Sequence, residues 1–305
     1  MVEKLSKNFF LYLSKNKLLN KGAKKWGLKL GAAQVVAGVS IDSVMKTVKH
    51  LNEKGLVCTV DHLGEFVLSK EEAVESAKVC IDTLEAIRAT GVNCNLSLKL
   101  TQLGLDIDRK LCMDNMYNIL EVAKKTKNFV RIDMEDYAHY HVTLEILAEL
   151  QKKYDHVGTV IQAYLYCAQK DLENLKGRSL RLVKGAYKES PSVAFQSKEK
   201  IDKNYLAIIK QHLLNGSYTA IATHDHVIIE KVMKFCEQKQ IPKTQFEFQM
   251  LYGFRTELQE KIVAEGYTMR VYVPFGKDWY GYFMRRLAER PQNVSFALKG
   301  LFSKK

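Results

Sequence analysis

Eight short apolar runs rich in β-branched and aromatic residues recur along the chain, separated by segments with helical spacing. The runs cover 55–61, 93–100, 129–135, 158–165, 180–187, 219–225, 246–251 and 268–274. The segments between them, such as 69–90 and 141–154, place apolar residues at i, i+3, i+4 and i+7, which is typical of a helix that buries one face. Ser69 and Glu72 predict a capping box at the start of the first segment. Eight successive strand–helix units predict an α/β fold, a (β/α)8 TIM-type barrel.

An open, doubly wound sheet would show the same alternation of strands and helices. That fold binds nucleotides at a glycine-rich turn after an early strand, and the sequence contains neither a GxGxxG nor a Walker-type turn. No Pro/Gly/Ser-rich linker divides the 305 residues, and single barrels reach this length. We therefore expect one barrel domain over 51–305, preceded by an N-terminal helical arm over 1–50.

The arm carries much of the basic charge of the chain. Residues 1–30 contain eight lysines and one acidic residue, which contributes +7 to a formal net charge of +13. Such a run is most often a solvated face, but it is also attracted to an anionic membrane surface. No nucleic-acid recognition motif accompanies the lysines, so we expect no nucleic-acid partner.

The cysteines and the first apolar run indicate where the protein works. The six cysteines lie in apolar segments without CxxC or other metal-ligand spacing, which indicates reduced thiols and no metal site. The run 26–39 contains Lys29 and Gln34 and is too short and too polar to cross a bilayer. We expect a cytoplasmic protein, with peripheral contact at the inner face of the membrane as a hypothesis for the basic arm.

Polar residues stand at the end of nearly every predicted strand, where a barrel places its active site. They are Asp61, Lys99, Asp133, Gln162, Tyr187, His224, Gln249 and Tyr272. Lys99 is predicted to pair with Asp133 because neighbouring strands lie about 5 Å apart, although a purely structural ion pair would look the same. A complete ring of polar strand ends favours an enzyme.

The last predicted helix carries an arginine pair on an aromatic and apolar segment. Asp278 is predicted to cap this helix, and Tyr282, Arg285, Arg286 and Glu289 fall on one face. One glutamate cannot pair with both guanidinium groups, whose planar fork matches a carboxylate or a phosphate. The pattern predicts a bound anion, and a ladder of exposed ion pairs is the alternative.

The segment RLVKGAY places Arg181 and Lys184 on a strand before Gly185. The two cations have opposite parity, so only one of them faces the barrel interior unless the strand bends. A cationic strand end followed by glycine suits a phosphate-bearing or redox-active cofactor.

Two His-x-His pairs support a different chemistry. His139 with His141, and His224 with His226, have the spacing found in metal-dependent hydrolases built on the same barrel. A metallohydrolase, or a basic membrane- or nucleic-acid-binding protein without chemistry, is therefore an alternative to a redox enzyme.

Taken together, the motifs resemble the proline dehydrogenase family, in its short monofunctional bacterial form. The resemblance covers 55–295 and rests on DHLGE (61–65), SLKL (97–100), RIDMED (131–136), VIQAY (160–164), RLVKGAY (181–187), ATHD (222–225), EFQMLYG (247–253) and VYVPFGKDWYGYFMRRLAERPQN (271–293). It implies FAD-dependent oxidation of L-proline to Δ1-pyrroline-5-carboxylate, the first step of proline degradation to glutamate. Hydride would pass to flavin N5 and the electrons to a membrane quinone. A separate pyrroline-5-carboxylate dehydrogenase would take the product, because the aldehyde dehydrogenase module of bifunctional members is not present in this sequence.

The resemblance also assigns roles to residues. The substrate carboxylate would be bound by Lys99, Arg285 and Arg286, and the ring would lie between Tyr272 and Tyr282. Asp133 and Tyr187 would be catalytic, and Glu65 and Glu289 would gate the site. The flavin would be held by Met134, Gln162, Arg181, Lys184, Gly185, Ala186, Thr223 and His224. The sequence departs from the family at Lys188, where bifunctional relatives have tryptophan, and at Asp225, where asparagine is frequent.

Overall fold

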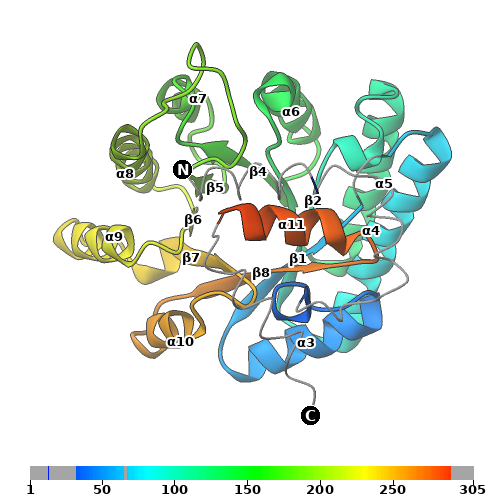
Figure 1. The fold of residues 1–305 in the computed structure, drawn as a ribbon, viewed down its shortest axis with the longest axis horizontal. Coiled ribbons are helices and arrows are strands. Elements are labelled where there is room, and N and C mark those ends of the chain that lie inside the picture. The colour runs from blue at the N-terminus through cyan, green and yellow to red at the C-terminus, as the bar shows by residue number, and fades with distance from the viewer. Residues whose placement is uncertain (1–12, 14–31, 65–66, 290–305) are drawn as a thin grey trace.

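A computed structural model describes residues 13, 32–64 and 67–289 of the protein. Eight parallel strands form a closed barrel in chain order (Figure 1). They are β1 (Val57–His62), β2 (Cys94–Leu98), β3 (Val130–Ile132), β4 (Val157–Gln162), β5 (Leu180–Val183), β6 (Thr219–Ala222), β7 (Phe246–Leu251) and β8 (Met269–Phe275). The predicted (β/α)8 barrel is confirmed.

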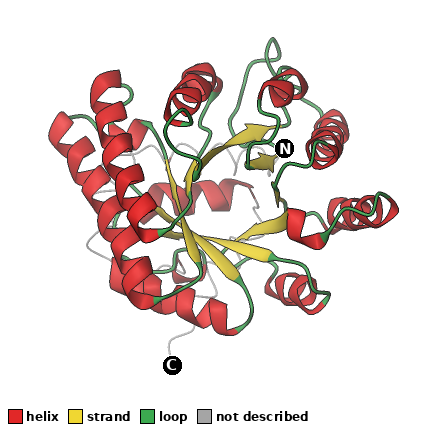
Figure 2. Ribbon diagram, turned by 180° about the vertical axis from the view of Figure 1, so that it is seen from behind, coloured by secondary structure: helices red, strands yellow, loops and turns green. Residues whose placement is uncertain are grey.

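Each strand is followed by a helix, and most of these helices form the outer ring seen from both sides in Figures 1 and 2. The helices are α3 (Ile41–Glu53), α4 (Lys70–Thr90), α5 (Arg109–Thr126), α6 (Tyr137–Leu150), α7 (Ala168–Asn174), α8 (Lys198–Leu214), α9 (His226–Gln238), α10 (Thr256–Ala264) and α11 (Trp279–Glu289). Short 3-10 turns are η2 (Ala32–Gln34), η3 (Thr101–Leu103) and η4 (Lys243–Gln245). Among the described residues, no helix is long and apolar enough to cross a membrane.

The six strands from β1 to β6 are shorter than their apolar runs predict. β3 ends at Ile132, β6 ends at Ala222, and β5 ends at Val183, four residues before Tyr187. After β5 the chain turns at Gly185, whose φ of 110° is a conformation that favours glycine. The prediction that Lys184 lies on a strand and that Tyr187 ends one is therefore wrong, and both residues belong to the loop after β5.

The capping box predicted at the start of α4 forms in only one of its two halves. The Glu72 amide donates to the Ser69 hydroxyl at 3.2 Å, so Ser69 caps the helix. The Glu72 carboxylate accepts from the amide of Leu68 at 2.7 Å rather than from that of Ser69. The reciprocal bond is thus displaced by one residue toward the N-terminus.

The main hydrophobic core lies between the outer face of the strands and the surrounding helices. The six cysteines are all free thiols, and five of them are buried. The inner faces of the strands differ from the branched apolar layers that usually fill a barrel. Their buried side chains include Thr59, Ser97, Arg131, Arg181, Glu247 and Gln249, and Arg270 is half-buried. A polar interior of this kind supplies charged groups to the carboxyl end of the barrel.

Helix α11 does not take the eighth position in the outer ring. Instead α3 packs against β1, β8 and α4. In both views α11 lies across the middle of the ring of strands (Figures 1 and 2). Trp279, Phe283 and Leu287 of α11 form a second apolar cluster with η2 and with Leu63, directly after β1. This contact places α11 at the carboxyl end of the strands. The helix α3 also runs across the predicted domain boundary at 50/51, whereas residues 1–12 and 14–31 of the basic arm lie outside the described residues.

Candidate active site

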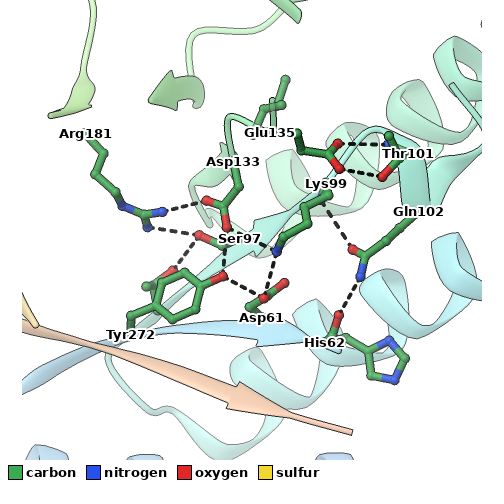
Figure 3. A network of polar contacts seen from close by, with 12 residues as sticks. Asp61, His62, Ser97, Lys99, Thr101, Gln102, Asp133, Glu135, Arg181 and Tyr272 are labelled. Atoms are coloured by element: carbon green, nitrogen blue, oxygen red, sulfur yellow. Dashed lines mark hydrogen bonds and ion pairs between the residues drawn. The ribbon is translucent and has the colours of Figure 1, made fainter. Parts of the chain in front are cut away.

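A cluster of charged side chains gathers where β1, β2, β3 and β8 end (Figure 3). Lys99 Nζ lies 2.9 Å from Asp61 Oδ2 and 3.5 Å from Asp133 Oδ2. The Tyr272 hydroxyl lies 2.6 Å from Asp61 Oδ2 and 2.8 Å from Asp133 Oδ2. The phenol has one proton and can donate fully to only one carboxylate at a time. Because its oxygen is within hydrogen-bond distance of both, it bridges the two acids. The predicted contact of Lys99 with Asp133 forms, but Asp61 is the closer partner.

The charges in this cluster stabilise one another. Burial opposes the charged form of Lys99, but Asp61 and Asp133 outweigh it and raise the pKa of the ammonium. Burial likewise opposes ionisation of Asp133, but the charges of Arg181 and Lys99 and the Tyr272 hydrogen bond hold its pKa below the ordinary value. Asp133 contacts Arg181 through Oδ1 and Lys99 through Oδ2, so it holds both cations at the end of β3.

Arg181 crosses the barrel interior and is held by side chains from three other strands or strand ends. Its Nη1 donates to Asp133 at 2.6 Å, its Nη2 to Ser97 at 3.0 Å and its Nε to Gln249 at 2.6 Å. The guanidinium also lies 5.3 Å from the centre of the Tyr272 ring. Of the two cations in RLVKGAY, Arg181 is thus the one that faces the interior.

Lys184 lies on the other side of the chain, toward α8 and α9. Its ammonium pairs with Asp202 at 2.5 Å and with Asp225 at 3.1 Å. Asp225 also caps α9 by accepting from the amide of Val227. A carboxylate at 225 therefore serves both the helix terminus and the lysine that follows β5.

The arginine pair lies on α11, as the helical spacing predicts. Both Arg285 and Arg286 are half-buried, and the Arg286 guanidinium lies 5.1 Å from the centre of the buried Tyr282 ring. Glu65 lies outside the described residues. The predicted gate pairing of Glu65 with α11 therefore stays a prediction.

Comparison with known proteins decides the family. The family model described as proline dehydrogenase matches residues 44–299. The chain belongs to the proline dehydrogenase family. Over 98% of its length it is 51% identical to Proline dehydrogenase 2 of Bacillus subtilis strain 168, covering 100% of that protein. It is 42% identical to Proline dehydrogenase of Deinococcus radiodurans, over 91% of each chain. The family resemblance read from the sequence is confirmed.

A solved structure agrees with this assignment. Proline utilization A from Bdellovibrio bacteriovorus, inactivated by N-propargylglycine, superposes with a TM-score of 0.83 at 29% sequence identity. The match covers 99% of this chain and 38% of that protein, so this chain corresponds to one part of the Bdellovibrio protein.

The residues predicted to hold the flavin differ in burial and in hydrogen bonding. Gln162 is 2% exposed; its Nε2 donates to the carbonyl of Glu135 at 3.0 Å, and its Oε1 has no hydrogen-bond partner among the described residues. Met134 and Thr223 are buried, whereas Ala186 and Tyr187 are exposed on the loop after β5. A buried acceptor without a donor is costly, so Gln162 Oε1 suits an N–H group of a ligand.

The His-x-His pairs do not converge on one site. His139 lies in the first turn of α6, where it contacts Asp106 at 2.8 Å and Asp136 at 2.5 Å. His224 accepts a hydrogen bond from the amide of Leu251 through Nε2. Within residues 32–64 and 67–289, no three His, Cys, Asp or Glu side chains are grouped as metal ligands.

Sequence reasoning missed two residues that hold the loop after β2. Glu135 accepts from both the amide and the hydroxyl of Thr101, at 3.2 and 2.6 Å. Gln102 accepts from the Lys99 amide at 3.4 Å and donates to the carbonyl of His62 at 3.0 Å. These bonds tie the Lys99 loop to the ends of β1 and β3 (Figure 3). Glu135 in the RIDMED segment, directly after β3, could have indicated a contact of this kind.

Proposed function

We propose that this protein oxidises L-proline to Δ1-pyrroline-5-carboxylate with FAD bound at the carboxyl end of the barrel. The observation that carries the proposal is the cluster of Lys99, Asp61, Asp133, Tyr272 and Arg181 in a chain of the proline dehydrogenase family. Bound FAD supplies a two-electron acceptor for the hydride. The protein supplies binding, orientation and electrostatics.

The cationic side chains favour the reactive form of the substrate. Hydride can leave the carbon beside nitrogen only when the nitrogen lone pair is available to form the C=N double bond. A protonated amine has no such lone pair, so the site must bind proline as the neutral amine. Together with Arg285 and Arg286, Lys99 and Arg181 would place four cations against the two carboxylates of Asp61 and Asp133. That excess opposes a further positive charge and thereby lowers the proton affinity of the substrate nitrogen. Asp61 and Asp133 keep Lys99 and Arg181 in place.

Substrate orientation comes from α11 and β8. We propose that Arg285 and Arg286 bind the carboxylate with Lys99, because the arginine fork matches a carboxylate in two parallel hydrogen bonds. Tyr272 and Tyr282 would lie against the faces of the pyrrolidine ring, and Tyr187 would close over it. Fixing both ends of a small substrate aims one C–H bond at the acceptor.

The residues present fit FAD in part. Gln162 offers a buried acceptor, Arg181 offers donors, and Gly185 permits a tight turn beside the ring of Tyr164. Met134, Ala186, Thr223 and His224 would complete the contacts to the ring and the phosphate tail. Lys184 pairs with two aspartates, which leaves the third N–H of its ammonium for a phosphate.

Electrons would pass to a membrane quinone, and a separate pyrroline-5-carboxylate dehydrogenase would take the product. The basic segment 1–30 would hold the protein at the membrane, since its charge is +7. Co-sedimentation with anionic and neutral vesicles tests this contact. Equal binding to both, or no change on deleting 1–30, would exclude it.

The absorbance spectrum of the purified protein and two variants test the proposed activity. Flavin bands and proline-dependent dye reduction are expected for the wild type. Arg285→Met and Arg286→Lys should each lower kcat/KM for proline by at least about 100-fold, near the upper range for a lost charged hydrogen bond, with flavin content unchanged. Normal proline turnover in both variants would refute the carboxylate clamp, and a protein without flavin or turnover would refute the activity.

A further inference from the structure

The polar interior of the barrel continues below the candidate site through β7. Glu247 and Gln249 are at positions i and i+2 of this strand, so their side chains share the inner face. They are 2% and 3% exposed. Gln249 Nε2 lies 2.5 Å from Glu247 Oε1, and Gln249 Oε1 lies 2.6 Å from Arg181 Nε. The amide of Gln249 therefore bridges a carboxylate and a guanidinium.

Hydrogen-bond chemistry allows only one orientation of this amide. A guanidinium can only donate, and an ionised carboxylate can only accept. Gln249 must therefore present its NH2 group to Glu247 and its oxygen to Arg181. Burial opposes ionisation of Glu247, but the charge of Arg270 and its 2.8 Å hydrogen bond outweigh it and keep the pKa of Glu247 below the ordinary value. Glu247 is thus a permanent acceptor.

Arg181 is held at three of its five N–H groups by described residues. Asp133 and Ser97 bind its two terminal nitrogens, and Gln249 binds Nε. One N–H group remains on each terminal nitrogen for a ligand. Without the Nε contact, the planar group could pivot about Asp133, and the direction of the two remaining N–H groups would change.

We propose that Glu247 and Gln249 are positioning residues for Arg181, with Glu247 fixing the orientation of the Gln249 amide and the amide fixing the guanidinium. The inference rests on the proposed function, in which Arg181 lies beside the reacting atom of the flavin. Neither residue lies at the strand end where Lys99 and Asp61 meet. Their effect on catalysis would pass through Arg181 alone.

Two variants remove the contact in different ways. Glu247→Gln keeps the size of the side chain but provides a group that can donate as well as accept, so the Gln249 amide loses its bias. Gln249→Met removes the amide and leaves the Glu247–Arg270 ion pair intact, which keeps the test available if Glu247→Gln does not fold. Tyr218→Phe is the matched control, because the Tyr218 hydroxyl donates to Glu247 Oε2 at 2.9 Å and not to the oxygen that faces Gln249.

The first measurement needs no flavin. In protein labelled with 15N-arginine, the Nε–H signal of Arg181, assigned with Arg181→Lys, should exchange slowly with solvent in the wild type and in Tyr218→Phe. It should exchange at least about tenfold faster in Glu247→Gln and Gln249→Met, since a broken contact of about 1.4 kcal/mol corresponds to that factor. Unchanged exchange in both variants would overturn the inference.

The second measurement separates positioning from folding and from substrate binding. With equal flavin content, kcat for proline should fall by on the order of 10- to 100-fold in both variants, as expected for a misplaced catalytic group. KM for proline should change less than about twofold, because the proposed carboxylate contacts are elsewhere. If the wild type is active and both variants have normal kcat, the positioning role is refuted but the proposed function is not. If the wild type has no flavin or no turnover, the proposed function is refuted. The exchange measurement still tests the contact in that case.

Discussion

Asp61→Asn should destabilise the protein because it removes one partner of a buried ion pair without changing its size. The Asp61 side chain is 2% exposed and that of Lys99 is 22% exposed. Asp61 Oδ2 receives contacts from Lys99 at 2.9 Å and from Tyr272 at 2.6 Å. After the substitution, Lys99 and Arg181 share the single carboxylate of Asp133.

The expected loss follows from these contacts. Breaking a buried pair by removing one partner costs about 3–5 kcal/mol. Lys99 keeps Asp133 at 3.5 Å and asparagine can still accept one bond, so we expect roughly 2–3 kcal/mol, below that range. At about 2 °C per kcal/mol for a chain of this size, Tm should fall by about 5 °C.

A double-mutant cycle in thermal unfolding, at one fixed FAD concentration, tests the reasoning. Lys99→Met removes the ammonium, and the double variant leaves Asp133 paired with Arg181 alone. The double variant should lose about 1.5 kcal/mol less than the sum of the single losses. Lys78→Met on α4 is the control, since its exposed pair with Asp82 should not change Tm measurably. Additive losses within about 0.5 kcal/mol would refute a stabilising pair.

Two other perturbations test the fold, the first at the amino end of β6 and the second in the loop after β5. Burial lowers the pKa of His212 from 6.5 to about 4, so the unfolded chain takes up a proton first as pH falls; stability is full above pH 6.5 and declines toward pH 4. At pH 5 the free energy of unfolding should be lower by about 2 kcal/mol because of this group. The urea midpoints at pH 7.5 and pH 5 should therefore differ less in His212→Gln than in the wild type. An equal difference in both proteins would contradict this account. Gly185→Ala should lower both Tm and flavin content, because its φ is 110° and a Cβ would lie 2.5 Å from the Tyr164 ring. Gly177→Ala, with φ of 81° and no atom within 4 Å of its Cβ, should cost less, and equal losses would show that the ring contact is unimportant.

The sequence allowed the barrel to be predicted because strand and helix periods alternate eight times and leave few competing folds. Parity along the run 180–187 also indicated that only one of Arg181 and Lys184 faces the interior, but not which of the two. The exact end of β5 was not predictable from apolar content, since Ala186 and Tyr187 extend the run beyond the turn at Gly185.

The polar interior was missed for a different reason. Arg131 with Asp133, Glu247 with Gln249, and Arg270 with Tyr272 each stand two residues apart within a strand or at its end, which is the spacing of one face. A prediction from apolar content alone ignores the charged and polar side chains that stand two positions apart in the same runs. That spacing by itself indicates a charged barrel interior.

The position of α11 could not be derived from periodicity. A helical pattern shows which side of a helix is apolar but not which surface covers it. Trp279, Phe283 and Leu287 fit the outer ring as well as they fit the cluster with Leu63. Only the packing of α3 on β1 and β8 shows that the place beside these strands is already filled.

Closure of the barrel sets the order in which the chain can fold during its synthesis. β1 pairs with β2 on one side and with β8 on the other, and Cys58 and its partner Val271 are more than 200 residues apart. While the ribosome is making the intervening chain, the outer edge of β1 has no strand to pair with, and an unpaired edge invites association with other chains. The nascent protein therefore depends on protection of that edge until β8 emerges, and the arginine-bearing helix can dock only afterwards.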